Sequence, residues 1–393
     1  MIRIARFVPF FSGEYGGPVK HILELTKFLN KYPIKTTVYA SSDINYLATK
    51  RTYNYQRLNE NFIIKRYNSY LRFRDYRVSL RFFLSLIKDY KNIDIFHSHA
   101  IRSFQEDIAA LVNIMKRKKC FIITTHGMLS AIKNYFQYLY KRIYDLTNSS
   151  LKNNLLDINY IGVSKTEIEI IRKYGIPDDR IHYIPHGVDT THFKPIYSKE
   201  ILEKYNLIDK EIILYIGRIS KRKGIDYLIK AFSLLKDEIP NAILLIVGGD
   251  YGYKNTIEKI VKNENLLKRI MFLGYIPKKD LPKIYSIANV IVYPSKFEIF
   301  GHVILEANAC EKLVIAVNHW GPKELIINGK TGFLTKYGDV QGLKEKIVYI
   351  LQNESLQKQM GKFARKYVKQ NYSWEKCAQK HFELYNNLLN FKR

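Results

Sequence analysis

Short apolar runs alternate with longer amphipathic stretches along most of the chain, which is the pattern of strands followed by helices. After the first run, apolar positions such as Val19, Ile22 and Leu29 recur at helical spacing, and Gly224 to Leu235 repeats this pattern later. Strands that alternate with helices predict a parallel, doubly wound sheet and hence an α/β protein. The predicted strands are Ile2–Val8, Thr36–Ala40, 93–97, 121–125, 159–163, Glu211–Ile216, Ala242–Val247, 270–273, 289–293 and 312–316.

The alternation of strands and helices restarts near residue 211, after a turn-rich segment from Pro185 to Pro195 that is typical of a hinge. A chain of 393 residues is long enough for two domains, each with its own core. We therefore expect one Rossmann-like domain over 1–188 and a second over 189–372. The remaining segment, 373–393, is expected to form one helix that packs back toward the N-terminal domain.

The formal net charge of +28 is large. It indicates either a composition bias toward lysine or an anionic partner, such as a membrane surface or nucleic acid. A helical interpretation of 74–90 places four cations on one face and four apolar side chains on a neighbouring one, as in a helix that lies on an anionic membrane. A solvated helix that packs on its own domain explains the pattern equally well. These residues are Arg74, Arg77, Arg81 and Lys88, with Leu80, Phe83, Leu84 and Ile87 beside them.

Cysteines and acidic residues give no sign of a metal site. Cys120, Cys310 and Cys377 are far apart, and no pair has the spacing of a zinc or redox motif. No Asp is followed two positions later by another Asp, so we expect neither a metal ion nor a cofactor. No apolar run approaches the roughly 20 residues that span a bilayer, and Met1 to Phe10 does not resemble a signal peptide. We expect a cytoplasmic protein, with peripheral attachment to the inner face of the membrane as the alternative left open.

The segment PSKFEIFGHVILEANAC holds the most informative chemistry of the chain. Glu298 is expected in a strand-to-helix loop, and Glu306 about two turns into the helix that follows. Phe300 and Gly301 would place free backbone N–H groups at the helix start, which suits a phosphate. Carboxylates on both sides suit hydroxyl groups, because ionised carboxylates only accept hydrogen bonds. A phosphate flanked by polyols is a nucleotide sugar.

Residues at the ends of other predicted strands also suit the binding of a nucleotide sugar. Gly16 and Gly17 follow the first strand and bring bare backbone to the ligand-binding edge of the sheet, although glycines in a turn usually serve only the turn. His126 ends another strand, where a lone histidine is more often structural. The loop 217–224 holds Arg218 and Lys223, two cations that could neutralise a diphosphate. Surface charge in a lysine-rich protein is the alternative interpretation of these two residues.

Taken together, these motifs resemble family 4 of the GT-B glycosyltransferases over nearly the whole chain. Each motif is weak alone, but seven in the family's order are hard to obtain by chance. They are Gly16-Gly17 with His21, Thr124-Thr125-His126-Gly127, Val163-Ser164, Ile184-Pro185-His186-Gly187-Val188-Asp189, Gly217-Arg218 with Lys223-Gly224, Glu298 with Glu306, and Gly321 with Glu324.

The resemblance implies two Rossmann-like domains that face each other across a cleft, with the donor on the C-terminal domain and the acceptor on the N-terminal one. It implies transfer of a sugar from a nucleotide diphosphate to an acceptor hydroxyl, with retention of the anomeric configuration and without a metal ion. The nucleotide sugar is then a co-substrate. The acceptor is expected to be a glycan or a lipid-linked glycan. A uridine diphosphate donor is the default expectation, and guanosine diphosphate is also plausible.

The resemblance also implies a role for each matched residue. Arg218 and Lys223 would grip the diphosphate, and Glu306 would hold the ribose hydroxyls. Glu298 would hold hydroxyls of the transferred sugar, and His126 would contact that sugar near the reacting carbon. We expect the catalytic group to be His126, Arg218, Lys223 and Glu298. The remaining donor-site residues would be the backbone groups of Phe300 and Gly301, with Gly16 or Gly17 letting the acceptor loop approach.

Several positions depart from the family pattern and leave the identity of the donor sugar open. His186 replaces the usual Asn, Ile299 a small residue, His302 an aliphatic residue and Trp320 a Gly. Three other functions remain as alternatives: a GT-B nucleotide-sugar epimerase, a basic nucleic-acid-binding protein and a catalytically dead scaffold. The basic residues form no known recognition motif, so no nucleic-acid partner is expected. The intact Arg218 and Lys223 disfavour the dead scaffold.

Overall fold

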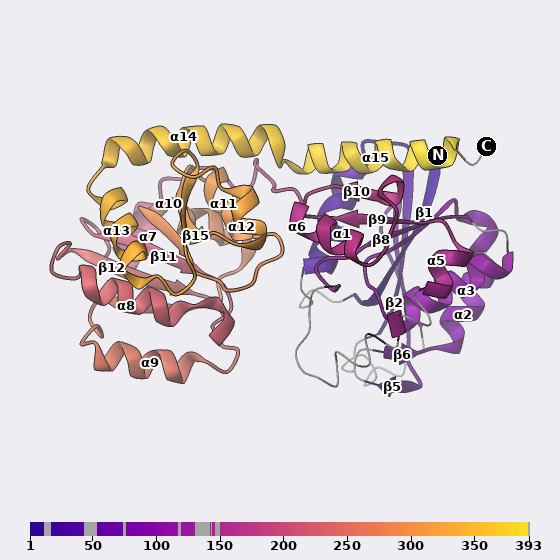
Figure 1. The fold of residues 1–393 in the computed structure, drawn as a ribbon, viewed down its shortest axis with the longest axis horizontal. Coiled ribbons are helices and arrows are strands. Elements are labelled where there is room, and N and C mark those ends of the chain that lie inside the picture. The colour runs from indigo at the N-terminus through magenta and orange to yellow at the C-terminus, as the bar shows by residue number, and fades with distance from the viewer. Residues whose placement is uncertain are drawn as a thin grey trace. The chain divides into compact units, whose positions relative to one another are not determined.

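The computed structural model describes residues 1–11, 17–42, 53–73, 76–116, 119–129, 142, 144–145 and 150–391. The chain forms two compact units, each with its own sheet and core (Figure 1). Unit 1 consists of Met1–Pro185 and Cys377–Arg393, and unit 2 consists of His186–Lys376.

Unit 1 is built on an eight-stranded sheet with the order β10-β9-β8-β7-β1-β2-β4-β3. Neighbouring strands are parallel except β3 and β4, which form an antiparallel pair. A separate antiparallel ribbon joins β5 (Leu71–Phe73) to β6 (Tyr76–Val78). The strands of the large sheet are β1 (Ile2–Phe10), β2 (Ile34–Ser41), β3 (Tyr53–Asn59), β4 (Phe62–Tyr67), β7 (Ile95–Ser98), β8 (Cys120–Thr124), β9 (Ile158–Gly162) and β10 (Ile181–Tyr183).

Helices pack on this sheet through their apolar faces, and central strands contribute a ladder of aromatic rings to the core. The rings of Phe7 and Phe96 stack with their centroids 5.5 Å apart, and those of Phe96 and Phe121 lie 6.0 Å apart. The helices are α1 (Gly17–Leu29), α2 (Leu80–Asp89), α3 (Phe104–Lys116), α5 (Ser150–Leu155), α6 (Lys165–Lys173) and, from Cys377 onward, α15 (Trp374–Asn390).

The predicted helix over 74–90 is wrong, because Tyr76–Val78 forms strand β6 and α2 begins only at Leu80. Arg77 lies on strand β6 and is buried. It donates to the Ser42 carbonyl at 2.9 Å, and its guanidinium lies 3.8 Å from the centre of the Phe10 ring. Arg77 therefore cannot share an exposed face with Arg81 and Lys88, and Arg74 lies outside the described residues.

Unit 2 is built on a six-stranded, fully parallel sheet with the order β13-β12-β11-β14-β15-β16. Its strands are β11 (Glu211–Ile216), β12 (Ala242–Val247), β13 (Ile270–Gly274), β14 (Val290–Tyr293), β15 (Leu313–Val317) and β16 (Gly332–Thr335). Its helices are α7 (Lys199–Lys204), α8 (Ile225–Leu235), α9 (Lys254–Asn263), α10 (Leu281–Ile287), α11 (His302–Ala309), α12 (Trp320–Leu325), α13 (Val340–Leu351) and α14 (Glu354–Asn371).

Both sheets reverse their strand order beside their first strand. In unit 1 this switch point lies between β1 and β7, and in unit 2 between β11 and β14. In open parallel sheets, ligands bind beyond the carboxyl ends of the strands at such points. The α/β class with two Rossmann-like domains is confirmed. Within the described residues, no helix combines the length and the apolarity that crossing a bilayer requires.

Candidate active site

The loops after β11 and β14 meet at the switch point of unit 2 through an ion pair. The Lys223 ammonium lies 2.7 Å from Oε2 of Glu298 and donates at 2.8 Å to the hydroxyl of Tyr293, the last residue of β14. The Tyr293 hydroxyl also donates to the same Glu298 oxygen. Two residues that the sequence places 75 positions apart are therefore in direct contact.

The ion pair sets the charge state of this cluster. Burial acts to raise the pKa of Glu298, but the charge of Lys223 and the hydrogen bonds from Lys223 and Tyr293 outweigh burial and lower it. Burial and the neighbouring carboxylate raise the pKa of Tyr293 well above its ordinary value, so Tyr293 remains a hydrogen-bond donor. Glu298 is thus an anion held by a cation and a neutral phenol.

Glycines let the three loops around Glu298 approach one another. Gly224 has φ of +66°, and a Cβ there would lie 2.3 Å from the carbonyl oxygen of Pro294. The N–H of Gly321 donates to the Glu298 carbonyl at 3.0 Å, and a Cβ on Gly321 would lie 2.3 Å from the Phe300 carbonyl oxygen. Any side chain at either position would push the loop of Glu298 away from its neighbours.

The other predicted donor-site residues of unit 2 lie on the same elements. Glu306 is on α11, one turn from its start rather than two, and accepts a hydrogen bond from Tyr285 of α10 at 2.8 Å. Gly301 is the N-cap of α11, and the N–H groups of Phe300 and Gly301 donate to no acceptor among the described residues. Arg218 is exposed at the end of β11, with its guanidinium 5.1 Å from the centre of the Tyr251 ring.

The predicted residues of unit 1 lie at the ends of β1 and β8. Gly17 is the exposed first residue of α1, whereas Gly16 lies outside the described residues. His126 follows β8 with φ of +46°, a left-handed conformation that non-glycine residues seldom adopt. Buried Glu167 of α6 secures this turn by accepting from Thr125 Oγ1 at 2.5 Å and from the N–H of Gly127.

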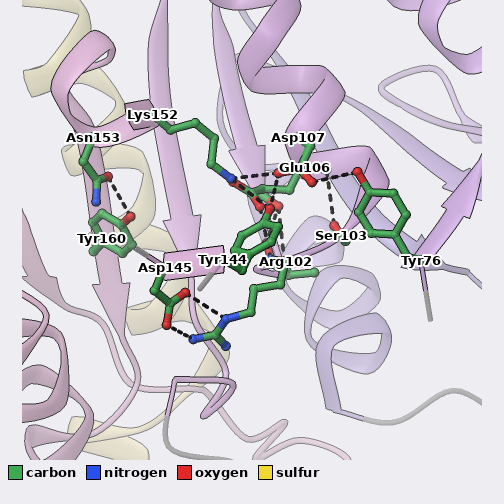
Figure 2. Close-up of polar contacts among 12 residues, drawn as sticks. Tyr76, Arg102, Ser103, Glu106, Asp107, Tyr144, Asp145, Lys152, Asn153 and Tyr160 are labelled. Atoms are coloured by element: carbon green, nitrogen blue, oxygen red, sulfur yellow. Dashed lines mark hydrogen bonds and ion pairs between the residues drawn. The ribbon is translucent and has the colours of Figure 1, made fainter. Parts of the chain in front are cut away.

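An ionic network in unit 1 joins Lys152, Glu106 and Asp107 to Arg102 and Asp145 (Figure 2). Lys152 of α5 reaches Glu106 at 2.5 Å and Asp107 at 2.9 Å, and these two carboxylates raise its pKa although burial acts to lower it. Arg102, after β7, pairs with Asp145 at 2.6 Å and donates to the Met128 carbonyl at 3.1 Å. Since Met128 lies two residues after His126, the network ties the loops after β7 and β8 together.

Two residues that depart from the family pattern, His186 and His302, contact each other. His186 Nδ1 lies 2.8 Å from His302 Nε2, and the two rings are stacked with their centroids 4.9 Å apart. The His186 ring also lies 5.0 Å from that of Phe300. His302 begins α11 and contributes to lowering the pKa of Glu298, so this pair adjoins the loop that we expect to hold the sugar.

Sequence reasoning found the charged residues of the site but missed the groups that hold them. It did not identify Tyr293, Tyr285 or Glu167 as such groups, nor His99 beside His126. Tyr293 could have been found, because it closes the buried strand before the glutamate motif. Within the described part of the chain, no group of three or more His, Cys, Asp or Glu residues could hold a metal ion.

Two doubly wound units with charged loops at the carboxyl ends of their strands define a GT-B protein. The structure of Anabaena HepE in complex with UDP and glucose agrees with this fold, with a TM-score of 0.78 over 98% of this chain and all of that one at 18% identity. The chain belongs to the group 1 glycosyltransferases. The family model "Glycosyl transferases group 1" matches residues 198–367, and the model "Glycosyltransferase Family 4" matches residues 15–192.

Relatives of the chain support this membership. An uncharacterised glycosyltransferase of Methanocaldococcus jannaschii is 31% identical over 300 residues, which is 76% of each chain. A GDP-mannose-dependent phosphatidylinositol monomannoside mannosyltransferase of Mycolicibacterium smegmatis is 30% identical over 50% of this chain and 54% of its own length. The predicted resemblance to this family of glycosyltransferases is therefore confirmed.

Proposed function

We propose that this chain transfers a hexose from a nucleoside diphosphate sugar to a hydroxyl group of a glycan or lipid-linked glycan. The anomeric configuration is retained, and no metal ion takes part. The donor binds to the loops after β11 and β14 of unit 2, and the acceptor binds to unit 1. The proposal rests on the family and on one observation, the Lys223–Glu298 ion pair at the switch point of the unit 2 sheet.

The ion pair supports the proposal through the hydrogen-bonding groups that it leaves unused. An ammonium has three protons, and the described residues accept two of those on Lys223. Lys223 and Tyr293 both bind Oε2 of Glu298, while Oε1 accepts no hydrogen bond from the described residues. One proton of a cation and one carboxylate oxygen therefore remain side by side. A diphosphate oxygen suits the first, and a sugar hydroxyl suits the second.

The reaction then follows from where charge develops. When the bond from the anomeric carbon to the diphosphate breaks, negative charge accumulates on the departing oxygens. Lys223 and the exposed Arg218 stabilise this charge more strongly in the transition state than in the bound donor, which raises kcat. Two cations can supply the electrostatic stabilisation that a metal ion provides in other transferases. Glu298, held by Lys223, binds hydroxyl groups and does not act as a nucleophile.

The nucleoside of the donor is uridine or guanosine. The HepE structure contains UDP, and the mycobacterial relative is named for GDP-mannose. A lipid-linked acceptor would suit peripheral attachment to the inner face of the membrane. Helix α2 supports this attachment, because Leu80 and Leu84 are 61% and 56% exposed and Arg81 and Lys88 are exposed beside them.

The test is a thermal-shift screen of the full chain against UDP- and GDP-sugars, with and without EDTA. A ligand that binds only the folded state raises the melting temperature. We expect one sugar nucleotide to raise it in both conditions, and the shift to fall in Glu306→Ala. Transfer to a synthetic lipid-linked acceptor, followed by NMR of the new anomeric centre, then tests retention. Failure of every sugar nucleotide to bind, or inversion in the product, would refute the proposal. Epimerised donor without transfer would favour an epimerase.

A further inference from the structure

A buried cluster of histidines in unit 1 surrounds a single arginine. Arg6 of β1 is fully buried, as are His97 on β7 and His99 just after it. The ring centroids of His97 and His99 lie 4.2 Å apart, and those of His99 and His126 lie 5.4 Å apart. The cluster consists of Arg6, His21, His97, His99, His126, His381 and Tyr385, the last two from α15.

Arg6 is a buried cation whose hydrogen-bond partners are all neutral. Among the described residues, no carboxylate lies within ion-pair distance of Arg6. Its guanidinium instead contacts His99 Nε2 at 2.7 Å, His97 Nδ1 at 3.4 Å and the Tyr385 hydroxyl at 3.1 Å. A guanidinium only donates hydrogen bonds. Each of these three atoms must therefore accept, and this requirement determines where the protons of the histidines lie.

The contact with Arg6 fixes the tautomer of His99. Burial, with His97 and Arg6 beside it, holds the pKa of His99 well below its usual range, so its ring is neutral. A neutral imidazole carries one proton, and Nε2 must be bare because it accepts from Arg6. The proton therefore lies on Nδ1, which is 3.1 Å from Nε2 of His126. His99 donates across this contact, so His126 accepts at Nε2 and in its neutral form carries its proton on Nδ1.

A second chain of hydrogen bonds starts at Arg6 and leads through Tyr385 and His97 to Thr124 instead of His126. The Tyr385 hydroxyl accepts from Arg6 and lies 2.9 Å from His97 Nδ1, to which it donates its own proton. His97 is neutral because burial, with Arg6 nearby, lowers its pKa well below the usual range. Its proton therefore lies on Nε2, 2.8 Å from Thr124 Oγ1. This branch does not pass through His126, so a variant at Tyr385 is a matched control.

We propose that Arg6 is a positioning residue that acts through His99 to hold His126 with its proton on Nδ1. His126 then meets a substrate oxygen at Nδ1 as a hydrogen-bond donor, and it cannot take a proton there as a general base. The buried charge of Arg6, transmitted through His99, polarises this N–H and strengthens it toward an oxygen that gains negative charge. The inference rests on the proposed function, because it assumes that His126 contacts a substrate of the transfer reaction.

The tautomer can be read directly by NMR, without any substrate. Full-length protein labelled with ¹⁵N-histidine gives long-range ¹H–¹⁵N correlations that distinguish protonated from bare ring nitrogens. Signals of His99 and His126 are assigned by their loss in His99→Gln and His126→Gln. In the wild type we expect both rings to carry the proton on Nδ1. A proton on Nε2 of His126, or on both of its nitrogens, would overturn the inference whether or not the chain transfers sugar.

Variants of Arg6 test its role. In Arg6→Met, we expect His126 to show a mixture of tautomers, because nothing then forces His99 to keep Nε2 bare. Arg6→Lys keeps a charged donor and should restore the Nδ1 proton of His126, whereas Tyr385→Phe should leave it unchanged. Circular dichroism confirms that each variant is folded. Should Arg6→Met not fold, the wild type and Arg6→Lys still decide, because a proton on Nε2 of His126 in either of them would refute the role of Arg6. A wild-type tautomer in Arg6→Met, or an altered one in Tyr385→Phe, would refute the role of Arg6.

Kinetics separate this inference from the proposed function. With the donor found in the thermal-shift screen, Arg6→Met should lower kcat about tenfold, because one positioned donor is worth about 10²–10³-fold and a mixture of tautomers forfeits only part of that. The KM for the donor should change little. An unchanged kcat despite a mixed tautomer would overturn the catalytic part of the inference. Absence of sugar-nucleotide binding in the wild type would instead refute the proposed function.

Discussion

Replacing Lys223 with Gln tests the proposed site most sharply, because Lys223 joins the two loops at the switch point. The glutamine amide is neutral and can keep one hydrogen bond to Glu298 or Tyr293. The variant therefore removes the charge and retains much of the packing. It deprives the departing diphosphate of one cation and leaves Glu298 without its counter-ion. Its effect on turnover should exceed its effect on folding, since the side chain of Glu298 is 24% exposed and can be solvated.

The expected magnitude follows from the charge that Lys223 would face. Two unit charges about 4 Å apart attract by about 4 kcal/mol at an effective dielectric constant of about 20. Cleavage adds close to one charge to the departing diphosphate, so Lys223 should stabilise the transition state by about 3–4 kcal/mol. This corresponds to a loss of about 10²–10³-fold in kcat for Lys223→Gln. The KM for the donor should rise less, because the bound donor lacks this extra charge.

The assay is release of nucleoside diphosphate at saturating donor and acceptor, with Lys221→Gln as the matched control. Lys221 lies in the same loop but is exposed and forms no ion pair among the described residues. Its removal should change kcat by less than about threefold, as expected for an exposed charge. The leaving-group role would be refuted if Lys223→Gln kept a kcat close to that of the wild type, or if Lys221→Gln lost as much activity.

Three further experiments test the structure around the site. Lys152→Met should lower the free energy of unfolding in urea by about 3–5 kcal/mol, because it leaves buried carboxylates without their cation. The control Arg172→Met breaks an exposed ion pair and should lower the free energy of unfolding by less than about 1 kcal/mol. Equal losses in the two variants would contradict the argument. Because the folded-state pKa of Glu298 is lowered, its charge stabilises the fold above the unfolded pKa of about 4.3 and stops doing so as the pH falls through the folded value. The stability difference between wild type and Glu298→Gln should therefore shrink in acid, and a constant difference would exclude the linkage. His186→Asn and His302→Leu should be coupled by about 1 kcal/mol in a double-mutant cycle, and strict additivity would show that their contact contributes nothing.

The buried strands were predictable and the exposed ones were not. The strand predicted over Glu211–Ile216 is β11, because a strand buried on both faces leaves an uninterrupted apolar run. Strand β3 escaped prediction because it lies at the edge of the sheet and its residues 55–59 are exposed, so no apolar run marks it. The helix predicted at 74–90 failed for the opposite reason. Arg77 looks like a surface residue in the sequence, but its guanidinium stacks on Phe10 and its charge is buried.

The sequence predicted the residues expected to contact a ligand, but not the contacts that hold these residues in place. Strand ends and short motifs pointed to Lys223 and Glu298, since local sequence determines which residues occupy a strand-to-helix loop. Their mutual contact and the hydroxyl of Tyr293 depend on which strands are neighbours, and periodicity does not reveal strand order. The same holds for Arg6 and Tyr385, which lie 379 positions apart in the sequence and are hydrogen-bonded in the fold.

The discontinuity of unit 1 has a consequence for how the chain is made. The Tyr385 hydroxyl accepts a hydrogen bond from the buried Arg6 guanidinium. The ribosome, however, makes all of 186–376 between the two segments of unit 1. At about 5–20 residues per second, a ribosome needs roughly ten to forty seconds to cross that stretch. Until α15 emerges, the Arg6 guanidinium in the N-terminal part of unit 1 stays exposed to water, although the sequence of unit 2 is already complete. Unit 1, whose synthesis begins first, is therefore the unit that completes its fold last.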